Sequence, residues 1–181
     1  MTELTTLGGG CYWCLEAIYQ RVRGVDGVIS GYSGGQTEHP TAAQVYSGST
    51  GHAECVRITF DPVVISYREI LEIFFTMHNP TTLNKQDYDV GEIYRSVIFY
   101  HSDEQKQLAE SMLTGFAAEL WDDPVVTHLV PIDRFWPADE TMQDFYNNNP
   151  NSGYCMAIIN PKVTKLRQKF AAKLKPIEDS A

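Results

Sequence analysis

Residues 4–14 read Leu4-Thr5-Thr6-Leu7-Gly8-Gly9-Gly10-Cys11-Tyr12-Trp13-Cys14 and join a candidate strand to a candidate helix. The strand covers Leu4 to Leu7 and ends at the three glycines. The residues after Cys14 show the i, i+3, i+4, i+7 spacing of one apolar helix face: Leu15, Ile18, Tyr19 and Val22. We expect Gly24 to end this helix, because glycine commonly follows the last helical residue.

Strand and helix signals alternate through the rest of the chain. Further strands are expected at 25–32, 54–60, 96–100 and 125–132. Further helices are expected to begin at capping or proline signals: Ser66 with Glu69, Ser102 with Gln105, and Asn160-Pro161. This mixture predicts an α+β fold built as a two-layer sandwich. Because no repeat or linker divides the sequence, we expect residues 1–181 to form a single catalytic domain.

Composition places the chain among ordinary globular proteins. Hydrophobic residues make up 43% of the chain and charged residues 20%. The formal net charge is −9, from 14 Lys and Arg against 23 Asp and Glu. This charge argues against binding to nucleic acids or to an anionic membrane surface, whose phosphates repel an acidic protein. No apolar stripe calls for a subunit partner, and we expect a monomer.

The N-terminus and the cysteines bear on the cellular compartment. Residues 1–7 lack the basic and apolar regions of a signal peptide, and no stretch reaches the ~18 apolar residues of a spanning helix. We therefore expect a cytoplasmic protein. The four cysteines are too few and too unevenly spaced for a secreted disulfide scaffold: Cys11, Cys14, Cys55 and Cys155. The close pair therefore indicates redox chemistry or a metal site.

Cys11 and Cys14 carry the strongest chemical signal. The glycines leave Cys11 near a helix N-terminus, where unpaired N–H groups and the positive dipole end favour thiolate over thiol. We therefore expect a lowered pKa and a nucleophilic sulfur at Cys11. Cys14 lies one helical turn further on, close enough to form a disulfide with Cys11. The alternative is that both are buried cysteines acting only as small apolar side chains.

Glu54 is the candidate acid. It lies in phase with Val56 and Ile58 on the apolar face of its strand, where burial should raise its pKa and leave a proton to donate. The alternative is an acid at the strand end that is turned to solvent. Polar residues at 84–89 and 94–96 indicate either site loops or solvated surface. The five histidines show no metal-binding spacing.

Five motifs occur in the order and spacing of one known family: Gly9-Gly10-Cys11-Tyr12-Trp13, Gly31-Tyr32-Ser33-Gly34-Gly35, Ser47-Gly48-Ser49-Thr50-Gly51-His52-Ala53-Glu54, Tyr94-Arg95-Ser96 and Gly153-Tyr154-Cys155. From about Leu7 to Pro161 the chain resembles peptide methionine sulfoxide reductase A. The resemblance implies a ferredoxin-like core with extra loops and a C-terminal helix, no cofactor, no metal, and thioredoxin as the recycling partner. It also implies reduction of the S epimer of methionine sulfoxide, free or within proteins.

The same resemblance implies roles for single residues. Cys11 matches the nucleophile, and Glu54 matches the acid that protonates the sulfoxide oxygen. Asp89 and Tyr94 match polar positions of the substrate pocket, where Tyr94 polarises that oxygen.

The implied substrate pocket also has an aromatic part and one departure. Tyr12 and Trp13 match the aromatic pair that receives the methyl group on sulfur. The family often has a tyrosine where this chain has Ala42, so one hydroxyl donor is missing there. Tyr46 or a water molecule is the expected substitute.

Two further cysteines serve recycling in this interpretation. Cys14 stands where many family members have glycine, as in a subset with a CxxC motif. Cys155 matches a recycling cysteine, and we expect it in a glycine-containing loop. Residues 156–160 lack the additional glycines and second cysteine of some members. Attack on the sulfoxide leaves a sulfenic acid on Cys11, which a nearby thiol condenses to a disulfide. Cys14 is the closest resolving thiol, and Cys155 either exchanges with it afterwards or resolves Cys11 directly.

Two rival interpretations remain at this point. A general dithiol oxidoreductase of the thioredoxin type also has CxxC after a strand, but it needs a later cis-proline and leaves Glu54 without a role. A non-catalytic metal-binding module would use Cys11, Cys14 and Cys155, which supply only three thiols.

Overall fold

A six-stranded sheet in the order β7-β6-β1-β3-β2-β8 forms the centre of the computed structural model, which describes residues 1–177. The strands are β1 (Glu3–Gly8), β2 (Val25–Ser33), β3 (Ala53–Phe60), β6 (Val97–Tyr100), β7 (His128–Pro131) and β8 (Phe135–Pro137). Neighbouring strands are antiparallel except β6 and β7, which run parallel. The predicted mixed α+β class is confirmed.

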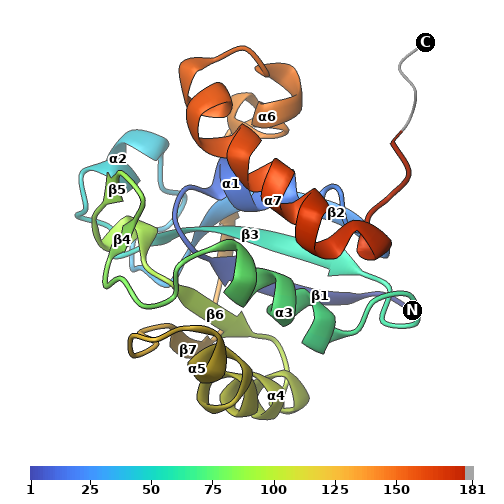
Figure 1. Cartoon of the computed structure of the whole chain (residues 1–181). Helices are drawn as coiled ribbons and strands as arrows, with labels where there is room; N and C mark the ends of the chain where they lie inside the picture. Colours follow the sequence, from blue (N-terminus) through green and yellow to red (C-terminus); the bar gives the residue numbers. More distant parts are fainter. Residues whose placement is uncertain (178–181) are drawn as a thin grey trace.

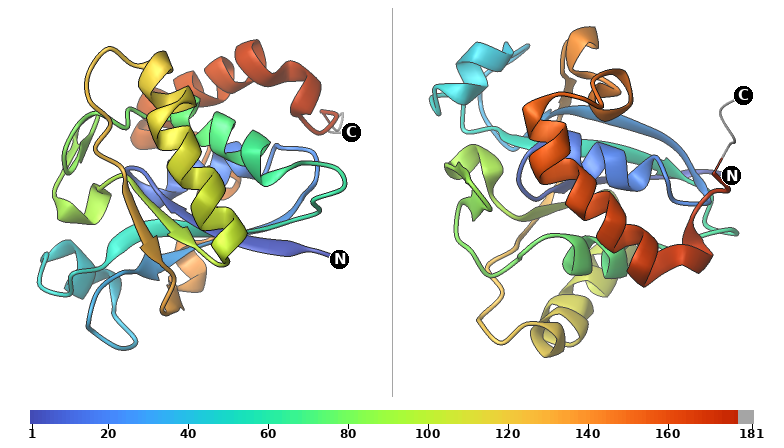
Figure 2. Two further views of the ribbon diagram at one scale, coloured as in Figure 1. Left: turned by 90° about the horizontal axis from the view of Figure 1, so that it is seen from below. Right: turned by 45° about the horizontal axis from the view of Figure 1, so that its top comes forward.

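Three helices cover one face of this sheet: α1 (Tyr12–Tyr19), α3 (Tyr67–Met77) and α7 (Asn160–Phe170) (Figure 1). In the turned views they lie next to one another, with α7 outermost (Figure 2). Helices α4 (Asp103–Thr114) and α5 (Phe116–Leu120) pack beside β6, β7 and α3. Two short helices, α2 (Ala42–Tyr46) and α6 (Phe145–Asn148), lie in connections. A small hairpin of β4 (Lys85–Gln86) and β5 (Asp89–Val90) forms a separate two-stranded sheet.

Successive side chains of β3 point to opposite faces of the sheet and belong to two separate hydrophobic clusters. Val56, Ile58 and Phe60 face the helices and are fully buried in the main core. Each such side chain contributes roughly 1.5–3 kcal/mol to folding through burial. Ala53 and Cys55 point to the other face, where they pack in a smaller cluster with Val97 and Phe99. The predicted two-residue period of this strand is confirmed.

Helix starts follow the capping residues. Ser66 accepts the N–H of Glu69, whose carboxylate accepts the N–H of Ser66 in return, so the predicted capping box is confirmed. Ser102 accepts the N–H of Gln105, but the Gln105 side chain bonds to His101 and Leu4 instead of closing the box. The helix that begins after Ser102 ends at Thr114, and Gly115, whose dihedral angles are neither helical nor extended, separates α4 from α5.

The sequence did not predict several short elements. Strands β4, β5 and β8 and helix α2 have two to five residues each, too few for a hydrophobic period to show. The segment Cys155–Ile159 is a π-helical turn that leads into α7, whereas a loop was predicted around Cys155. π-helical turns are rare and occur frequently at functional sites.

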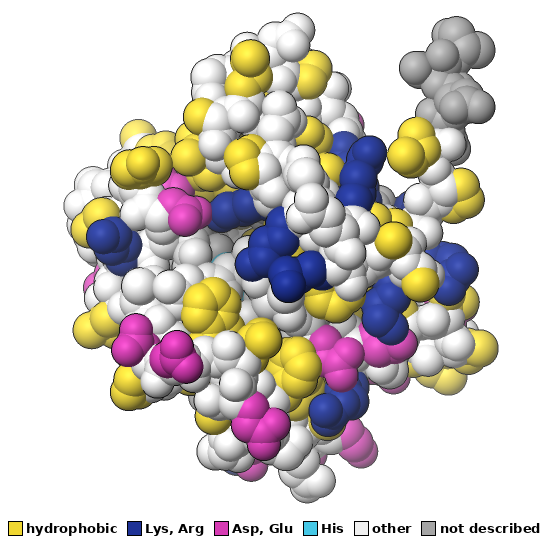
Figure 3. Space-filling view, viewed as in Figure 1, with side chains coloured by type: hydrophobic (Ala, Val, Ile, Leu, Met, Phe, Trp, Pro, Cys, Tyr) yellow, Lys and Arg dark blue, Asp and Glu magenta, His cyan; other side chains and the backbone are white. Residues whose placement is uncertain are grey.

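Charge is unevenly distributed over the fold. In the acidic chain, α7 carries four Lys and Arg and no acidic residue: Lys162, Lys165, Arg167 and Lys169. Figure 3 shows basic side chains gathered over this helix. Within residues 1–177, no helix combines the length and the apolar character needed to cross a membrane.

Candidate active site

Gly9 and Gly10, which follow β1, lead to Cys11 at the N-terminal end of α1. Cys11 is the extended N-cap residue, and its carbonyl accepts the N–H of Cys14 at 3.1 Å. A Cβ atom on Gly9 would lie 2.9 Å from the His78 ring. Gly10 has a φ of +89°, and a Cβ there would lie 2.8 Å from Gln86. Glycine is therefore required at both positions, because the backbone passes directly against neighbouring side chains.

The ring of His78 packs against the glycine turn before Cys11. It ends α3, as its place in the sequence predicted, and its ring is buried. One ring nitrogen bonds to the Phe74 carbonyl, and the other lies 2.7 Å from the Ser96 hydroxyl. Burial lowers the pKa of His78 to about 4. The neutral ring is therefore a packing surface for Gly9 and not a proton donor.

Glu54 lies beneath α1 on the helix-facing side of β3. It pairs with Tyr32 across the β2–β3 ladder and is 1% exposed. Its Oε2 has no hydrogen-bond partner among the described residues. Burial, followed by the charges of Asp89 and Cys14, raises the pKa of Glu54 well above its ordinary value. The predicted burial of this carboxyl is confirmed, and its role as an acid stays a prediction.

The two thiols of the CxxC motif shift each other's pKa in opposite directions. Burial, then the hydrogen bond with Cys14 and the charge of Glu54, raises the pKa of Cys11 well above its ordinary value. The same hydrogen bond lowers the pKa of Cys14 to about 7, against the effect of burial and with help from Lys162 and Tyr154. The lowered pKa predicted for Cys11 is therefore wrong. The backbone at Trp13 does favour the Cys11 thiolate, but burial and the second sulfur outweigh it.

Two tyrosine hydroxyls belong to the same cluster. Tyr94 ends a short 3-10 helix (Glu92–Tyr94), and its carbonyl accepts the N–H of Gly10. Burial, then the charges of Glu54 and Asp89, raises the pKa of Tyr94. Tyr46 ends α2, and burial, then Glu54 and Cys11, raises its pKa as well. Tyr46 stays the candidate for the hydroxyl donor that Ala42 does not supply.

The predicted aromatic pair is divided between two environments. Tyr12 is fully buried, and its hydroxyl lies 2.9 Å from that of Tyr32. Trp13 is half-buried and stacks on Phe145, with 3.5 Å between ring centroids and 5° between planes. The edge of Tyr154 meets Trp13 at 5.8 Å. Trp13 therefore offers apolar surface at the site entrance, whereas Tyr12 lies behind it.

Three polar residues around Cys14 complete the cluster. Asp89 accepts a hydrogen bond from the Tyr154 hydroxyl at 2.8 Å, and that hydroxyl lies 3.5 Å from Cys14 Sγ. Lys162 forms an ion pair with Asp87 at 2.9 Å. The polar run 84–89 was noted in the sequence, but Lys162 had no signal because it lies in an ordinary basic helix.

The other two cysteines lie apart from this pair. Cys155 is fully buried at the start of the π-helical turn, and in residues 1–177 no hydrogen bond joins its sulfur to another cysteine. The loop predicted there is wrong, because residues 155–159 form a π-helical turn that buries Cys155 and Ile159 and leaves Met156 exposed. Cys55 faces the opposite side of the sheet, donates to the Gly31 carbonyl and is a packed strand residue.

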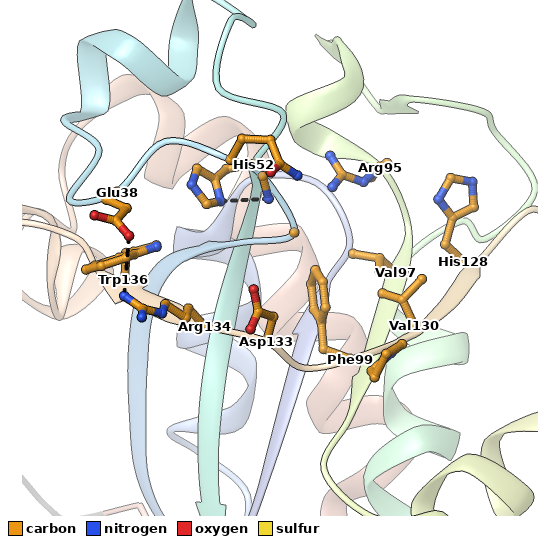
Figure 4. A pocket seen from close by; sticks show the side chains of 14 residues that line it. Glu38, His52, Arg95, Val97, Phe99, His128, Val130, Asp133, Arg134 and Trp136 are labelled. Carbon is orange, nitrogen blue, oxygen red and sulfur yellow. Dashed lines mark hydrogen bonds and ion pairs between the residues drawn. The ribbon is translucent and has the colours of Figure 1, made fainter.

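A cavity of about 570 Å³ lies on the face of the sheet opposite α1. Figure 4 shows Arg95, His52 and Phe99 among its lining residues. Arg95 donates to the Glu92 and Gly51 carbonyls, and His52 accepts the N–H of Gly35, so both side chains hold the surrounding loops. No cysteine lines this cavity. We therefore place the candidate site at the Cys11 cluster, which contains the predicted nucleophile Cys11 and the predicted acid Glu54.

Comparison with known proteins decides between the interpretations. The family described as "Peptide methionine sulfoxide reductase" matches residues 3–174. The chain belongs to this family. A family member from Sulfolobus acidocaldarius, "Peptide methionine sulfoxide reductase MsrA", is 52% identical over 171 residues, which are 94% of this chain and 97% of the relative. The chain is therefore an oxidoreductase of this family.

Solved structures agree with the family assignment. Reduced Mxr1 from Saccharomyces cerevisiae matches with a TM-score of 0.77 and 31% identity, over 85% of this chain and 89% of that one. Mxr1 in complex with Trx2 matches with a TM-score of 0.54 and 26% identity, over 80% and 84%.

Neither rival interpretation agrees with these findings. Membership of the family excludes a dithiol oxidoreductase of the thioredoxin type, and no peptide bond among the described residues is cis. No group of three metal-ligating side chains within residues 1–177 is placed to hold a metal.

Proposed function

We propose that the chain reduces methionine S-sulfoxide, free or within proteins, to methionine through attack by Cys11. The observation that supports the proposal is the burial of the Glu54 carboxyl, whose Oε2 has no hydrogen-bond partner among the described residues and whose pKa is raised, in the same cluster as Cys11 and Cys14. A sulfoxide needs a nucleophile at sulfur and a proton at oxygen in one water-poor pocket. Tyr94 and Tyr46 supply neutral hydroxyls to the oxygen, and Trp13 contacts the methyl group.

The first half-reaction uses the protons that the site holds. Cys11 passes its proton to the Cys14 thiolate and attacks the sulfoxide sulfur, while Glu54 protonates the oxygen. The S–S bond to substrate breaks as oxygen moves to Cys11, which leaves methionine and a sulfenic acid on Cys11. The sulfoxide sulfur is reduced and the Cys11 sulfur is oxidised.

The second half-reaction closes a disulfide. The Cys14 sulfur bonds to Cys11, the S–O bond of the sulfenic acid breaks, and the hydroxyl leaves as water with the Cys14 proton. The two hydrogens of that water were held by Glu54 and Cys11 in the resting site. The CxxC arrangement thus acts as one unit that passes a proton from Cys11 to Cys14 and then to the departing water.

Recycling is assigned to thioredoxin. The existence of a solved complex of Mxr1 with Trx2 supports this partner. Cys155 serves as the recycling cysteine that exchanges with the Cys11–Cys14 disulfide. Since Cys155 is fully buried, the exchange requires the π-helical turn to move. Alternatively, Cys155 attacks the Cys11 sulfenic acid directly. The variants Cys14→Ser and Cys155→Ser distinguish these two routes.

We further infer a ferredoxin-like core. The strand order β6-β1-β3-β2 and the element sequence β1, α1, β2, β3, α3, β6 support this topology. The protein acts as one catalytic domain and as a monomer, and its free thiols suit the reducing cytoplasm.

The decisive assay incubates the protein with dithiothreitol and each separated epimer of methionine sulfoxide. We expect methionine from the S epimer only, and none from either epimer with Cys11→Ser. Turnover retained by Cys11→Ser removes the nucleophile assignment. Turnover of the R epimer at an equal rate contradicts the proposed stereospecificity.

A further inference from the structure

The cavity on the face of the sheet opposite α1 has a buried positive charge at one end. Arg95, two residues before β6, is 8% exposed and lines this cavity of about 570 Å³. Its guanidinium donates to two backbone carbonyls, those of Glu92 and Gly51. No ion pair within residues 1–177 includes Arg95. A buried cation without a carboxylate partner is costly, because two carbonyls do not replace the water that it lost.

The groups around Arg95 do not provide the missing anion. Burial lowers the pKa of Arg95, and the charges of Glu92 and Cys55 only partly oppose this effect. Both ring nitrogens of His52, which also lines the cavity, already bond to backbone groups. A guanidinium has five N–H donors, so the two backbone carbonyls leave donors of Arg95 available to a ligand.

Gly34 keeps space open beside the guanidinium. It has a φ of +91°, and a Cβ atom there would lie 2.8 Å from an Arg95 nitrogen and 3.1 Å from the Phe99 ring. Any side chain at this position would therefore press on both groups. In the view of Figure 4 the guanidinium lies above Val97 and Phe99, and these two side chains line the cavity with Val130. The charged end is therefore next to an apolar wall.

The other end of the cavity is aromatic and carries the acidic groups. Figure 4 shows Trp136 at the end away from Arg95. Glu38 and Arg134, both exposed, form an ion pair there at 3.7 Å, and Asp133 is exposed as well. Two carboxylates at this rim disfavour a ligand with two negative charges. A single carboxylate suits Arg95 better, because a guanidinium binds it through two parallel hydrogen bonds.

We propose that this cavity is a binding site for a small monocarboxylate with an apolar or aromatic body, held through its carboxylate by Arg95. The volume of the cavity lies within the ~300–1,000 Å³ of small-molecule sites. The apolar wall and Trp136 would contact the body of the ligand. The site lies on the opposite face of the sheet from Cys11 and is independent of the proposed function.

Titration calorimetry with three probes tests the ligand class at constant ionic strength. Sodium benzoate carries the carboxylate on an aromatic ring, benzamide has the same shape without the charge, and inorganic phosphate is an anion without an apolar body. We expect a Kd of about 1 mM or below for benzoate. Benzamide and phosphate should each bind at least about tenfold more weakly, because each lacks one of the two interactions. Benzoate binding matched by either probe would overturn the proposal, as would the absence of heat with millimolar benzoate.

Three variants test the residues of the site. Arg95→Met removes the cation, and Val130→Phe fills the cavity while it keeps Arg95. Arg57→Met is the matched control, because Arg57 lies over the Phe135 ring on the same face of the sheet and does not line the cavity. We expect the first two variants to weaken benzoate binding by about tenfold or more and the control to bind as the wild type does. Circular dichroism and thermal unfolding establish that each variant folds.

Heteronuclear NMR of the indole N–H groups locates the probe. Benzoate should shift the signal of Trp136, which is assigned by its loss in Trp136→Phe, and leave the signal of Trp13 unchanged. A shift at Trp13 instead would place benzoate in the candidate active site and overturn the proposal. Unchanged binding by Arg95→Met would overturn it too. If Arg95→Met does not fold, unchanged binding by Val130→Phe has the same consequence. None of these outcomes depends on methionine production, so the proposed function is tested separately.

Discussion

Replacing Glu54 by glutamine tests the acid directly. The amide is nearly the same size as the carboxyl and fits the same buried space, but it cannot donate a carboxylic proton. A positioned general acid contributes about 10²–10⁴-fold to rate, or roughly 3–5 kcal/mol of barrier. Because the Tyr94 and Tyr46 hydroxyls remain beside the oxygen, we expect a loss of about 10²–10³-fold in the first half-reaction. Single-turnover formation of methionine without reductant measures it.

The pH dependence of the same variant has a definite sign. The wild-type rate should fall as pH rises through the raised pKa of Glu54, and the Glu54→Gln rate should lack this loss. In folding, the raised pKa stabilises the protein fully below the ordinary value of 4.5 and loses this effect as pH rises through the folded value. Denaturant unfolding should therefore show Glu54→Gln gaining stability over the wild type as pH increases from about 4.5.

Glu16 provides a matched control. It is also a buried carboxyl, 1% exposed, but it accepts hydrogen bonds from Ser30 and the N–H of Phe145. Glu16→Gln should reduce methionine sulfoxide within about threefold of the wild type, a difference of roughly 0.7 kcal/mol. A Glu54→Gln enzyme as fast as this control at neutral pH would refute the acid assignment.

Three further changes test recycling, substrate contact and packing. Cys14→Ser and Cys155→Ser should each release one methionine per enzyme but lose thioredoxin-driven turnover, as followed by NADPH consumption through thioredoxin reductase. Tyr46→Phe should lower kcat/KM about tenfold, the value of one hydrogen bond of roughly 1.4 kcal/mol. Gly9→Ala should destabilise the fold by about 1–3 kcal/mol in urea unfolding, because its Cβ would press against the His78 ring.

Each of these predictions has an outcome that contradicts it. Full turnover by either cysteine variant makes that cysteine dispensable. Tyr88 is 89% exposed, and Tyr88→Phe is therefore the control for Tyr46→Phe. Equal kinetics for the two variants would remove Tyr46 from the pocket. If Gly9→Ala unfolds at the same urea concentration as the wild type, the His78 ring moves aside without a loss of folding stability.

The sequence predicted the parts of the site that local pattern determines. The glycine run before Cys11, the phase of Glu54 along its strand and the capping box at Ser66 all follow from neighbouring residues. Each was confirmed as a structural feature, because a two-residue or 3.6-residue period needs no knowledge of the rest of the fold.

The features that depend on distant residues were missed or wrong. The pKa of Cys11 follows from burial beneath other elements and from a second thiol, which the helix N-terminus alone does not reveal. Helix α7 packs on α1, although the two helices begin almost 150 positions apart in the sequence. Cys155 was assigned to a loop because turn-forming residues precede it, but it begins a π-helical turn that buries Cys155 and Ile159.

The pairing of Tyr32 with Glu54 across β2 and β3 limits which insertions and deletions the site tolerates. Moving β3 by a single residue would rotate every side chain of the strand to the opposite face. Glu54 would then enter the small cluster with Phe99, and the thiol of Cys55 would lie under α1 in place of the carboxyl. One inserted or deleted residue before this strand would therefore exchange a proton donor for an extra sulfur, even if the core remained apolar. The register of β3 therefore determines which reactive side chain lies under α1 as well as which side chains fill the core.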